Sequence, residues 1–202
     1  WYQRRVRGSM KQIKTVLMGD MNVGKTSLAI RISRDIFEEN NVPTVGVTYF
    51  NKDKVNKITN QKTRLVIWDT AGEEKHRSLP PMYYRNSHIL IYVFNPENEE
   101  SIENISYWFD QSKKVGGSNP VNILVSTMSD KLQLSRKDEI ISAIGQLESK
   151  LKCKCFFVSA KTNDGIEALI DHLFDVSALI KGEVKEEIVR TEVVTNKKQT
   201  CC

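Results

Sequence analysis

The stretch of sequence that decides the fold reads Gly19-Asp20-Met21-Asn22-Val23-Gly24-Lys25-Thr26. It matches the pattern Gly-x-x-x-x-Gly-Lys-Ser/Thr, in which backbone N–H groups and a helix N-terminus surround phosphate oxygens. The apolar segment Ile13–Met18 predicts a strand before the loop, and Lys25–Ser33 predicts a helix after it. A chance match in a chain of this length has odds on the order of 1% at average composition. The loop therefore predicts a phosphate-binding site.

Strand-like and helical segments alternate along the rest of the chain. The pattern predicts strands at Val45–Ile58, Thr63–Trp68, Ile89–Phe94, Val121–Val125 and Phe156–Val158, with a polar turn at Thr59–Lys62. It predicts helices around Leu79–Tyr84 and at Ser101–Lys114, Ser135–Leu151 and Asp164–Leu179, with Gly116 and Gly117 ending the second. This alternation indicates an α/β fold, with a six-stranded, mostly parallel sheet flanked by helices. Ligands bind such sheets at the carboxyl ends of the strands.

The composition is typical of one folded domain. The chain has 202 residues, of which 40% are hydrophobic and 27% charged, and no apolar run approaches the roughly 18 residues of a membrane span. The net charge is +5, but residues 1–14 alone hold five basic residues and no acid. The rest of the chain is close to neutral. Since a nucleic-acid-binding domain carries its basic charge on the folded body, this distribution argues against a nucleic-acid partner.

The ends of the chain differ from its middle. We expect residues 1–10 to be a leader outside the fold, residues 11–180 to form the domain, and residues 181–202, which show no core face, to be a flexible tail. Four cysteines are too few for a disulfide framework, and Cys153 with Cys155 is a weak zinc candidate without a second ligand pair. We expect these two to flank or enter a strand.

A second candidate site begins at Asp69, at the end of a predicted strand in Trp68-Asp69-Thr70-Ala71-Gly72. A carboxylate there can hold Mg²⁺ through water, although an acidic residue before a turn is common. Lys25 would reach the β- and γ-phosphates of a nucleotide, and the Thr26 hydroxyl would bind Mg²⁺. Gly72 could bring its N–H close to a γ-phosphate because it has no Cβ.

Taken together, these segments resemble a known family. The chain is similar to a Ras-superfamily small GTPase, and within that superfamily to the Rab branch, over about residues 11–180 and the last two residues. The matching segments are Val42-Pro43-Thr44-Val45-Gly46-Val47, Trp68-Asp69-Thr70-Ala71-Gly72-Glu73-Glu74, Tyr83-Tyr84-Arg85, Ser159-Ala160-Lys161 and Cys201-Cys202. Each is weak alone, and their order and spacing carry the resemblance.

The resemblance implies a P-loop small GTPase that binds GTP or GDP with Mg²⁺. The metal residues would be Thr26, Thr44 and, through water, Asp69, and the catalytic residues Lys25 and Glu73. Thr44 would close over the γ-phosphate, Phe37 would contact the base, and the Ala160 amide would face the guanine oxygen. The implied nucleotide-binding residues are Met21, Asn22, Val23, Gly24, Lys25, Thr26, Ser27, Phe37, Thr44, Gly72, Thr127, Met128, Asp130, Ser159, Ala160 and Lys161.

The sequence departs from the family in the base-recognition segment, which is usually Asn-Lys-x-Asp. Here it reads Thr127-Met128-Ser129-Asp130. Asp130 can still accept hydrogen bonds from guanine N1 and N2, donors that adenine lacks. Thr127 resembles the Rho branch, and Met128 can lay an apolar chain along the base. We expect guanine specificity with an affinity reduced by roughly 1–2 kcal/mol.

Two further departures bear on catalysis. Glu73 stands where the family has the Gln that orients the attacking water, and an ionised Glu cannot donate a hydrogen bond. Met21 stands where a small residue is usual, and Asn22 replaces a frequent Gly. We expect hydrolysis as slow as, or slower than, the rate of about 10⁻⁴ s⁻¹ of Ras alone.

The last residues imply a membrane anchor. A terminal Cys201-Cys202 is the Rab pattern for attaching two geranylgeranyl groups, and two lipid chains give stable yet reversible anchoring. The resemblance then implies a monomer on the cytoplasmic face of endomembranes that cycles with the cytosol and regulates vesicle trafficking. Implied partners are an exchange factor, a GTPase-activating protein, a GDP-dissociation inhibitor, the prenylation machinery and effectors.

Two alternatives stay open. Met21, Glu73 and Met128 favour a pseudo-GTPase, a binding module locked with GTP or insensitive to nucleotide, whereas the intact Lys25 and Asp130 favour nucleotide binding. A Rho-like cytoskeletal switch rests on Thr127 alone, because the Tyr-Tyr-Arg run and the Cys-Cys ending oppose it.

Overall fold

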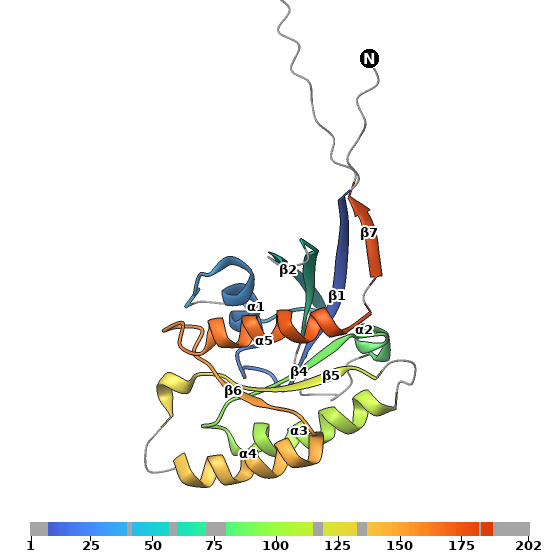
Figure 1. The fold of residues 1–202 in the computed structure, drawn as a ribbon. Helices are drawn as coiled ribbons and strands as arrows, with labels where there is room; N and C mark the ends of the chain where they lie inside the picture. Colours follow the sequence, from blue (N-terminus) through green and yellow to red (C-terminus); the bar gives the residue numbers. More distant parts are fainter. Residues whose placement is uncertain are drawn as a thin grey trace, which may run out of the picture.

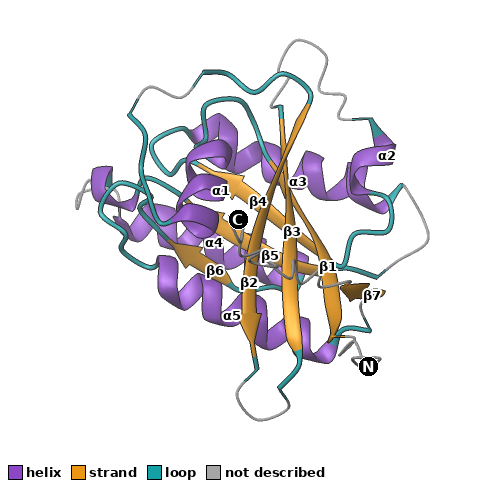
Figure 2. Ribbon diagram, turned by 90° about the horizontal axis from the view of Figure 1, so that it is seen from above, coloured by secondary structure: helices purple, strands orange, loops and turns teal. Residues whose placement is uncertain are grey.

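The computed structural model describes residues 8–39, 42–56, 60–71, 80–114, 119–132, 137–181 and 183–187. The strands are β1 (Gly8–Met18), β2 (Val47–Val55), β3 (Lys62–Thr70), β4 (Ile89–Phe94), β5 (Val121–Ser126), β6 (Cys155–Phe157) and β7 (Glu183–Glu187). The helices are α1 (Lys25–Arg34), α2 (Pro81–Tyr84), α3 (Glu99–Lys113), α4 (Lys137–Leu151) and α5 (Ile166–Leu179), with a 3₁₀ turn η1 (Ser129–Lys131). Figures 1 and 2 show their arrangement.

The sheet has seven strands, of which six lie side by side in the order β2-β3-β1-β4-β5-β6, and β7 pairs with the start of β1. Among these six strands all neighbours are parallel except β2 and β3, which form an antiparallel pair with Val47 opposite Thr70 and Val55 opposite Lys62. The predicted α/β fold with a six-stranded, mostly parallel sheet is confirmed. The strand at Ile89–Phe94 has the predicted bounds, and all six of its residues are buried because β4 lies in the middle of the sheet.

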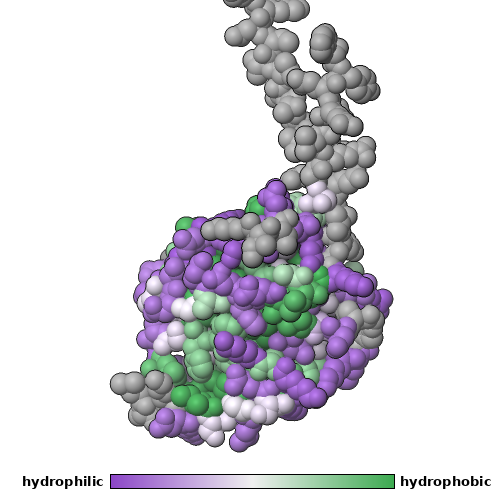
Figure 3. Space-filling view, viewed as in Figure 1, coloured by the Kyte–Doolittle hydropathy of each residue, from purple (hydrophilic) through white to green (hydrophobic). Residues whose placement is uncertain are grey.

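Two pairs of helices cover the two faces of the sheet (Figure 1). Side chains on a strand alternate between faces, so Ile13 and Leu17 of β1 pack in the core with α1 and α5. Val16 and Met18 of the same strand pack in the opposite core with α3 and α4. Hydrophilic residues cover much of the face drawn in Figure 3, with apolar residues between them. The two cores fix the sheet edge from which the loops of the site emerge.

The structure corrects the predicted ends of the domain. Gly8, Ser9 and Met10, assigned to the leader, belong to β1, and Met10 is buried. β7, which lies in the predicted tail, pairs antiparallel with β1, with Gly8 opposite Glu187. On one side of β1, β4 pairs only with Thr15 to Met18, so the backbone of the earlier residues of β1 is available to pair with β7. This pairing uses backbone groups and needs no apolar pattern, so hydrophobic periodicity could not reveal it.

Smaller differences affect the ends of single elements. β2 spans a shorter range than the predicted strand at residues 45–58, and Lys62, predicted in the turn, begins β3. α3 begins before Ser101, because the Asn98 side chain accepts a hydrogen bond from the Ser101 N–H (3.3 Å) and caps the helix. The predicted start of α4 at residue 135 and the glycines at 116 and 117 lie outside the described residues.

Cys155 begins β6 and Cys153 lies two residues before it, so the two flank or enter a strand as predicted. Both are partly buried free thiols. Within the described ranges, no group of three or more His, Cys, Asp or Glu residues could hold a metal ion, so the zinc interpretation gains no support. In the same part of the chain no helix combines the length and the apolar character needed to cross a membrane.

Candidate functional site

A cavity of about 500 Å³ opens at the carboxyl ends of the parallel strands. Its walls come from the loops after β1, β3, β5 and β6 and from the segment between α1 and β2. The residues that line it are Met21, Asn22, Gly24, Lys25, Thr26, Ser27, Leu28, Phe37, Glu38, Glu39, Val42, Pro43, Thr44, Thr70, Ala71, Thr127, Met128, Asp130, Lys131, Val158, Ser159, Ala160 and Lys161. This is the place where parallel α/β sheets bind ligands.

Glycine is required at both ends of the loop between β1 and α1. A Cβ on Gly19 would lie 2.1 Å from the Val93 carbonyl oxygen, too close for any side chain. Gly24 adopts φ 88° immediately before α1, a conformation that L-residues rarely take. The loop therefore lies tightly against β4 and turns directly into the helix, so the α1 N-terminus lies at the cavity.

Lys25, the first residue of α1, holds the loop from inside. Its side chain is buried, and its Nζ donates hydrogen bonds to the carbonyl oxygens of Gly19 (2.9 Å) and Asp20 (2.5 Å). The ammonium group therefore lies within the loop that it completes, at the wall of the cavity. A buried cation beside a helix N-terminus strongly favours an anionic ligand.

Three oxygen-bearing side chains meet near Lys25, on the same side of the cavity. The hydroxyl oxygens of Thr26 and Thr44 lie 2.8 Å apart. Both donate to Asp69 Oδ2, at 2.8 and 3.1 Å. Burial raises the pKa of the Asp69 carboxyl, against the hydrogen bonds from Thr26 and Thr44 and the charge of Lys25, which lower it.

This cluster fits a Mg²⁺ ion. Asp69 is fully buried, and its second oxygen, Oδ1, has no hydrogen-bond partner among the described residues. Burying a carboxylate oxygen without a partner is costly, and a cation would offset that cost. Two hydroxyls and one carboxylate form an all-oxygen donor set of the kind that Mg²⁺ prefers. The residues that the sequence predicts for a metal site are therefore adjacent in space.

The loop after β5 is tied to the loop after β1. The buried Thr127 hydroxyl donates to the carbonyl oxygens of Val23 (2.6 Å) and Phe94 (3.0 Å). Met128 has a left-handed backbone (φ 51°), and its methyl end lies 3.6 Å from the position that a Cβ on Gly24 would take. Thr127 therefore joins the two loops, and Met128 forms an apolar wall beside the glycine.

Asp130 is held at the cavity by the loop after β6. The buried Ser159 hydroxyl donates to Asp130 Oδ1 (2.6 Å) and accepts a hydrogen bond from the Thr162 N–H (3.1 Å). This chain orients the exposed carboxylate without occupying Oδ2. The carboxylate can accept hydrogen bonds from two adjacent N–H donors of a ligand.

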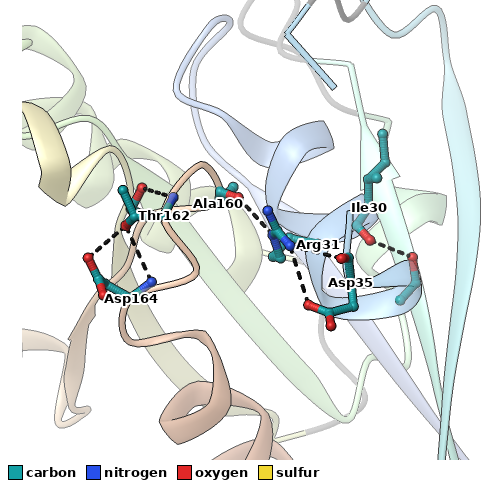
Figure 4. Close-up of polar contacts among 8 residues, drawn as sticks. Ile30, Arg31, Asp35, Ala160, Thr162 and Asp164 are labelled. Atoms are coloured by element: carbon teal, nitrogen blue, oxygen red, sulfur yellow. Dashed lines mark hydrogen bonds and ion pairs between the residues drawn. The ribbon is translucent and has the colours of Figure 1, made fainter. Parts of the chain in front are cut away.

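Arg31 of α1 lies beside the same loop and supports it (Figure 4). Arg31 Nε donates to the Ala160 carbonyl oxygen (2.7 Å), and Arg31 Nη1 donates to the Asp35 carbonyl oxygen (2.9 Å) at the end of α1. Lys161 Nζ lies 3.9 Å from Glu39 Oε1, an exposed ion pair between two cavity-lining residues. Phe37, two residues before Glu39, is half-buried and also lines the cavity.

Most of the predicted nucleotide-binding residues line this one cavity. Val23 does not, because its side chain is 1% exposed and packs in the core, and it contributes its carbonyl to Thr127 instead. Asp69 contacts the cavity through two lining threonines. Met21 is 37% exposed and lines the cavity, as its position in the loop predicts. Gly72, Glu73, Cys201 and Cys202 lie outside the described residues.

Sequence reasoning missed several lining residues. They are Leu28, Glu38, Glu39, Val42, Pro43, Thr70, Ala71, Lys131 and Val158. Most are sequence neighbours of predicted residues, so widening each motif by one or two positions would have found them. Glu38 and Glu39 directly follow the predicted Phe37 on the connection between α1 and β2, so they would be found in the same way.

Comparison with known proteins agrees with this geometry. The Ras family model matches residues 14–178. The chain is 30% identical over 191 residues to Ras-related protein RabC of Dictyostelium discoideum, covering 94% of this chain and 96% of that protein. It is 35% identical over 162 residues to Ras-related protein Rab-21 of Homo sapiens, covering 80% and 70%. Ras-related protein Rab-5B of Plasmodium falciparum is 30% identical over 174 residues, covering 85% and 80%.

Proposed function

Because the chain belongs to the Ras family of small GTPases, on its Rab branch, we propose that it is a Mg²⁺-dependent GTP/GDP switch in vesicle trafficking that hydrolyses GTP slowly. The observation that carries the proposal is that both kinds of binding group line one cavity. It brings a buried ammonium and a helix N-terminus to one wall and an oriented carboxylate to another. The ammonium and the helix N-terminus suit phosphates, and the carboxylate suits the N1 and N2 donors of guanine.

Each wall has a separate task in binding. Lys25 and the N–H groups of the loop hold the phosphates, because their charge and dipoles face the cavity. Asp130, oriented by Ser159, selects guanine over adenine, since adenine lacks the two donors that the carboxylate accepts from. Met128 covers the base with an apolar chain where the family has a lysine, which supports the expected loss of roughly 1–2 kcal/mol in affinity.

Thr26, Thr44 and Asp69 would hold Mg²⁺ on the phosphate side of the cavity. When bound, Mg²⁺ supplies positive charge that stabilises the β- and γ-phosphate oxygens during phosphoryl transfer. Thr44 lies on the segment between α1 and β2, so its contact with the γ-phosphate side would order that segment. Gly72 would make a second contact to the γ-phosphate, and loss of that phosphate would release the segments that hold Thr44 and Gly72.

The slow hydrolysis follows from the side chains near the γ-phosphate. Glu73 replaces the water-orienting Gln, and an ionised carboxylate adds negative charge where the transition state already spreads charge over three oxygens. Met21 is a long side chain at the cavity wall, where an arginine supplied by a GTPase-activating protein would have to enter. Both features support a long-lived GTP state.

The same features support a second candidate, a pseudo-GTPase that stays locked with GTP or binds partners without regard to nucleotide. Met21 and Met128 both line the cavity, so two bulky apolar side chains occupy walls that the family keeps small or charged. Against full insensitivity, Lys25, Asp130 and the Thr26–Thr44–Asp69 cluster are arranged to bind a nucleotide and its metal.

We further propose that Cys201 and Cys202 carry two geranylgeranyl groups. These would anchor the protein reversibly to the cytoplasmic face of endomembranes. The prenylation machinery would then attach the lipids, and a GDP-dissociation inhibitor would bind the lipidated protein. An exchange factor, a GTPase-activating protein and effectors would act on the GTP/GDP switch. The protein would act as a monomer. Replacing both cysteines with Ser should release it to the cytosol, and persistent membrane binding would contradict the anchor.

Single-turnover GTP cleavage tests the proposed function. The protein is loaded with GTP and Mg²⁺, and phosphate release is followed over hours. We expect a rate at or below about 10⁻⁴ s⁻¹, and we expect Glu73→Gln combined with Met21→Ser to raise it. Lys25→Met is the control that should weaken binding of both nucleotides and stop cleavage. Cleavage at the rate of a Gln-containing relative, or no response to the double substitution, would contradict the slow-hydrolysis account.

A further inference from the structure

Asp20 stands between two residues of the phosphate loop but is not among the described residues that line the cavity. Its side chain turns instead to α3, where both carboxylate oxygens accept hydrogen bonds. Trp108 Nε1 donates to Oδ1 (2.8 Å), and Asn104 Nδ2 donates to Oδ2 (2.8 Å). The two donors are four residues apart, so they lie on the same face of the helix.

The backbone of Asp20 points the other way. Its carbonyl oxygen accepts a hydrogen bond from Lys25 Nζ (2.5 Å). One residue therefore connects α3, through its side chain, to the buried ammonium of the phosphate site, through its main chain. We propose that Asp20, held by Asn104 and Trp108, is a positioning residue that sets where the Lys25 ammonium lies against the nucleotide phosphates.

The support on α3 is rigid enough for this task. Trp108 is 4% exposed and packs in the core that α3 and α4 form on the sheet, with Tyr107 edge-on at 5.5 Å between ring centroids. Its indole N–H therefore has a fixed position. Two charge-assisted hydrogen bonds from fixed donors define the orientation of the carboxylate and, through it, of the Asp20 peptide.

The arrangement also limits competition for the ammonium. A carboxylate five residues from Lys25 in the same loop could pair with the ammonium and would then oppose phosphate binding. Asn104 and Trp108 engage both oxygens of Asp20 on the α3 side, and its neutral carbonyl accepts the hydrogen bond from Lys25. The two hydrogen bonds from α3 thus hold the Asp20 carboxylate against pairing with the ammonium.

This inference rests on the proposed function, since it assigns Asp20 a role in nucleotide binding. The test measures GDP dissociation from the full chain with a fluorescent GDP analogue and excess unlabelled GDP. Asp20→Asn replaces one carboxylate oxygen with an amide NH₂ group, which then faces a donor on Asn104 or Trp108. Trp108→Phe removes the indole N–H. We expect each to speed dissociation about tenfold, the usual effect of a lost hydrogen bond to a charged group. Asp110→Asn, the same change of acid to amide at an exposed site on α3, should leave dissociation unchanged.

A double-mutant cycle separates positioning from a general loosening of the fold. With Lys25→Ala already present, Asp20→Asn should change dissociation less than about twofold, because its effect acts through the ammonium. The phosphorus resonance of the β-phosphate of bound GDP should move in Asp20→Asn and Trp108→Phe, and stay in place in Asp110→Asn.

The outcomes are distinct. Equal acceleration with and without Lys25→Ala, or an unmoved phosphorus resonance, would overturn the positioning role while leaving the proposed function intact. If Lys25→Ala binds GDP too weakly for the cycle, the phosphorus resonance decides alone. Failure of the unsubstituted chain to bind GDP would overturn the proposed function itself, and the role of Asp20 with it.

Discussion

Thr127 offers the sharpest test of how the site is built. Its hydroxyl is buried and donates to the carbonyl oxygen of Val23 at 2.6 Å. The Phe94 carbonyl oxygen is the other acceptor, and it also accepts a hydrogen bond from the Thr127 N–H (3.0 Å), which Thr127→Val retains. The substitution therefore mainly removes the hydrogen bond to the Val23 carbonyl. Leaving a buried carbonyl without this donor costs about 1–3 kcal/mol. We expect the free energy of unfolding to fall by that amount and GDP to dissociate faster, since Val23 lies in the phosphate loop.

The assay is urea unfolding of the nucleotide-free chain, paired with GDP dissociation from the loaded chain. Thr127→Ser is the matched control, because it restores the hydroxyl and removes only a methyl group. It should recover most of the lost stability. An unfolding free energy for Thr127→Val within about 0.3 kcal/mol of the unsubstituted chain, inside the error of such measurements, would refute the account of Thr127 as a tie between the two loops.

Three further predictions follow from other contacts. Ser159→Ala frees the Asp130 carboxylate and should weaken GDP binding about tenfold, measured by titration; unchanged affinity would contradict the orienting role. The Arg64 guanidinium lowers the Asp53 pKa, so this pair stabilises the fold at neutral pH and loses its effect as pH falls through that lowered pKa; Asp53→Asn should cost at most about 1 kcal/mol at pH 7 and nothing in strong acid. Burial raises the pKa of Cys155 to about 12, so alkylation mapped by mass spectrometry should be far slower in the folded than in the unfolded chain; equal rates would contradict this.

Much of the fold could be predicted because local signals agreed with one another. The phosphate loop fixed a strand before it and a helix after it, and both lie there. The continuous apolar run at Ile89–Phe94 is typical of a strand buried on both faces, and β4 is such a strand. β7 could not be predicted, because a strand that pairs through its backbone at a sheet edge needs no core face.

The site divides in the same way. Motifs placed Lys25, Thr26 and Asp130 at one cavity because each motif follows a strand of the same parallel sheet. The contacts that hold these residues join distant parts of the chain, and no pattern in one sequence reveals them. Arg31 reaches a carbonyl 129 residues away, and Asp20 is held from α3, 84 and 88 residues further on.

The identity and amount of nucleotide that co-purifies with the chain test the central claim most directly. The protein is denatured, and the released nucleotide is resolved by chromatography and counted per chain. We predict close to one guanine nucleotide per chain, because the phosphate loop and the oriented carboxylate of Asp130 share one cavity. A large share of GTP would also support slow hydrolysis. An adenine nucleotide, or an empty protein that takes up no added GDP, would contradict the account.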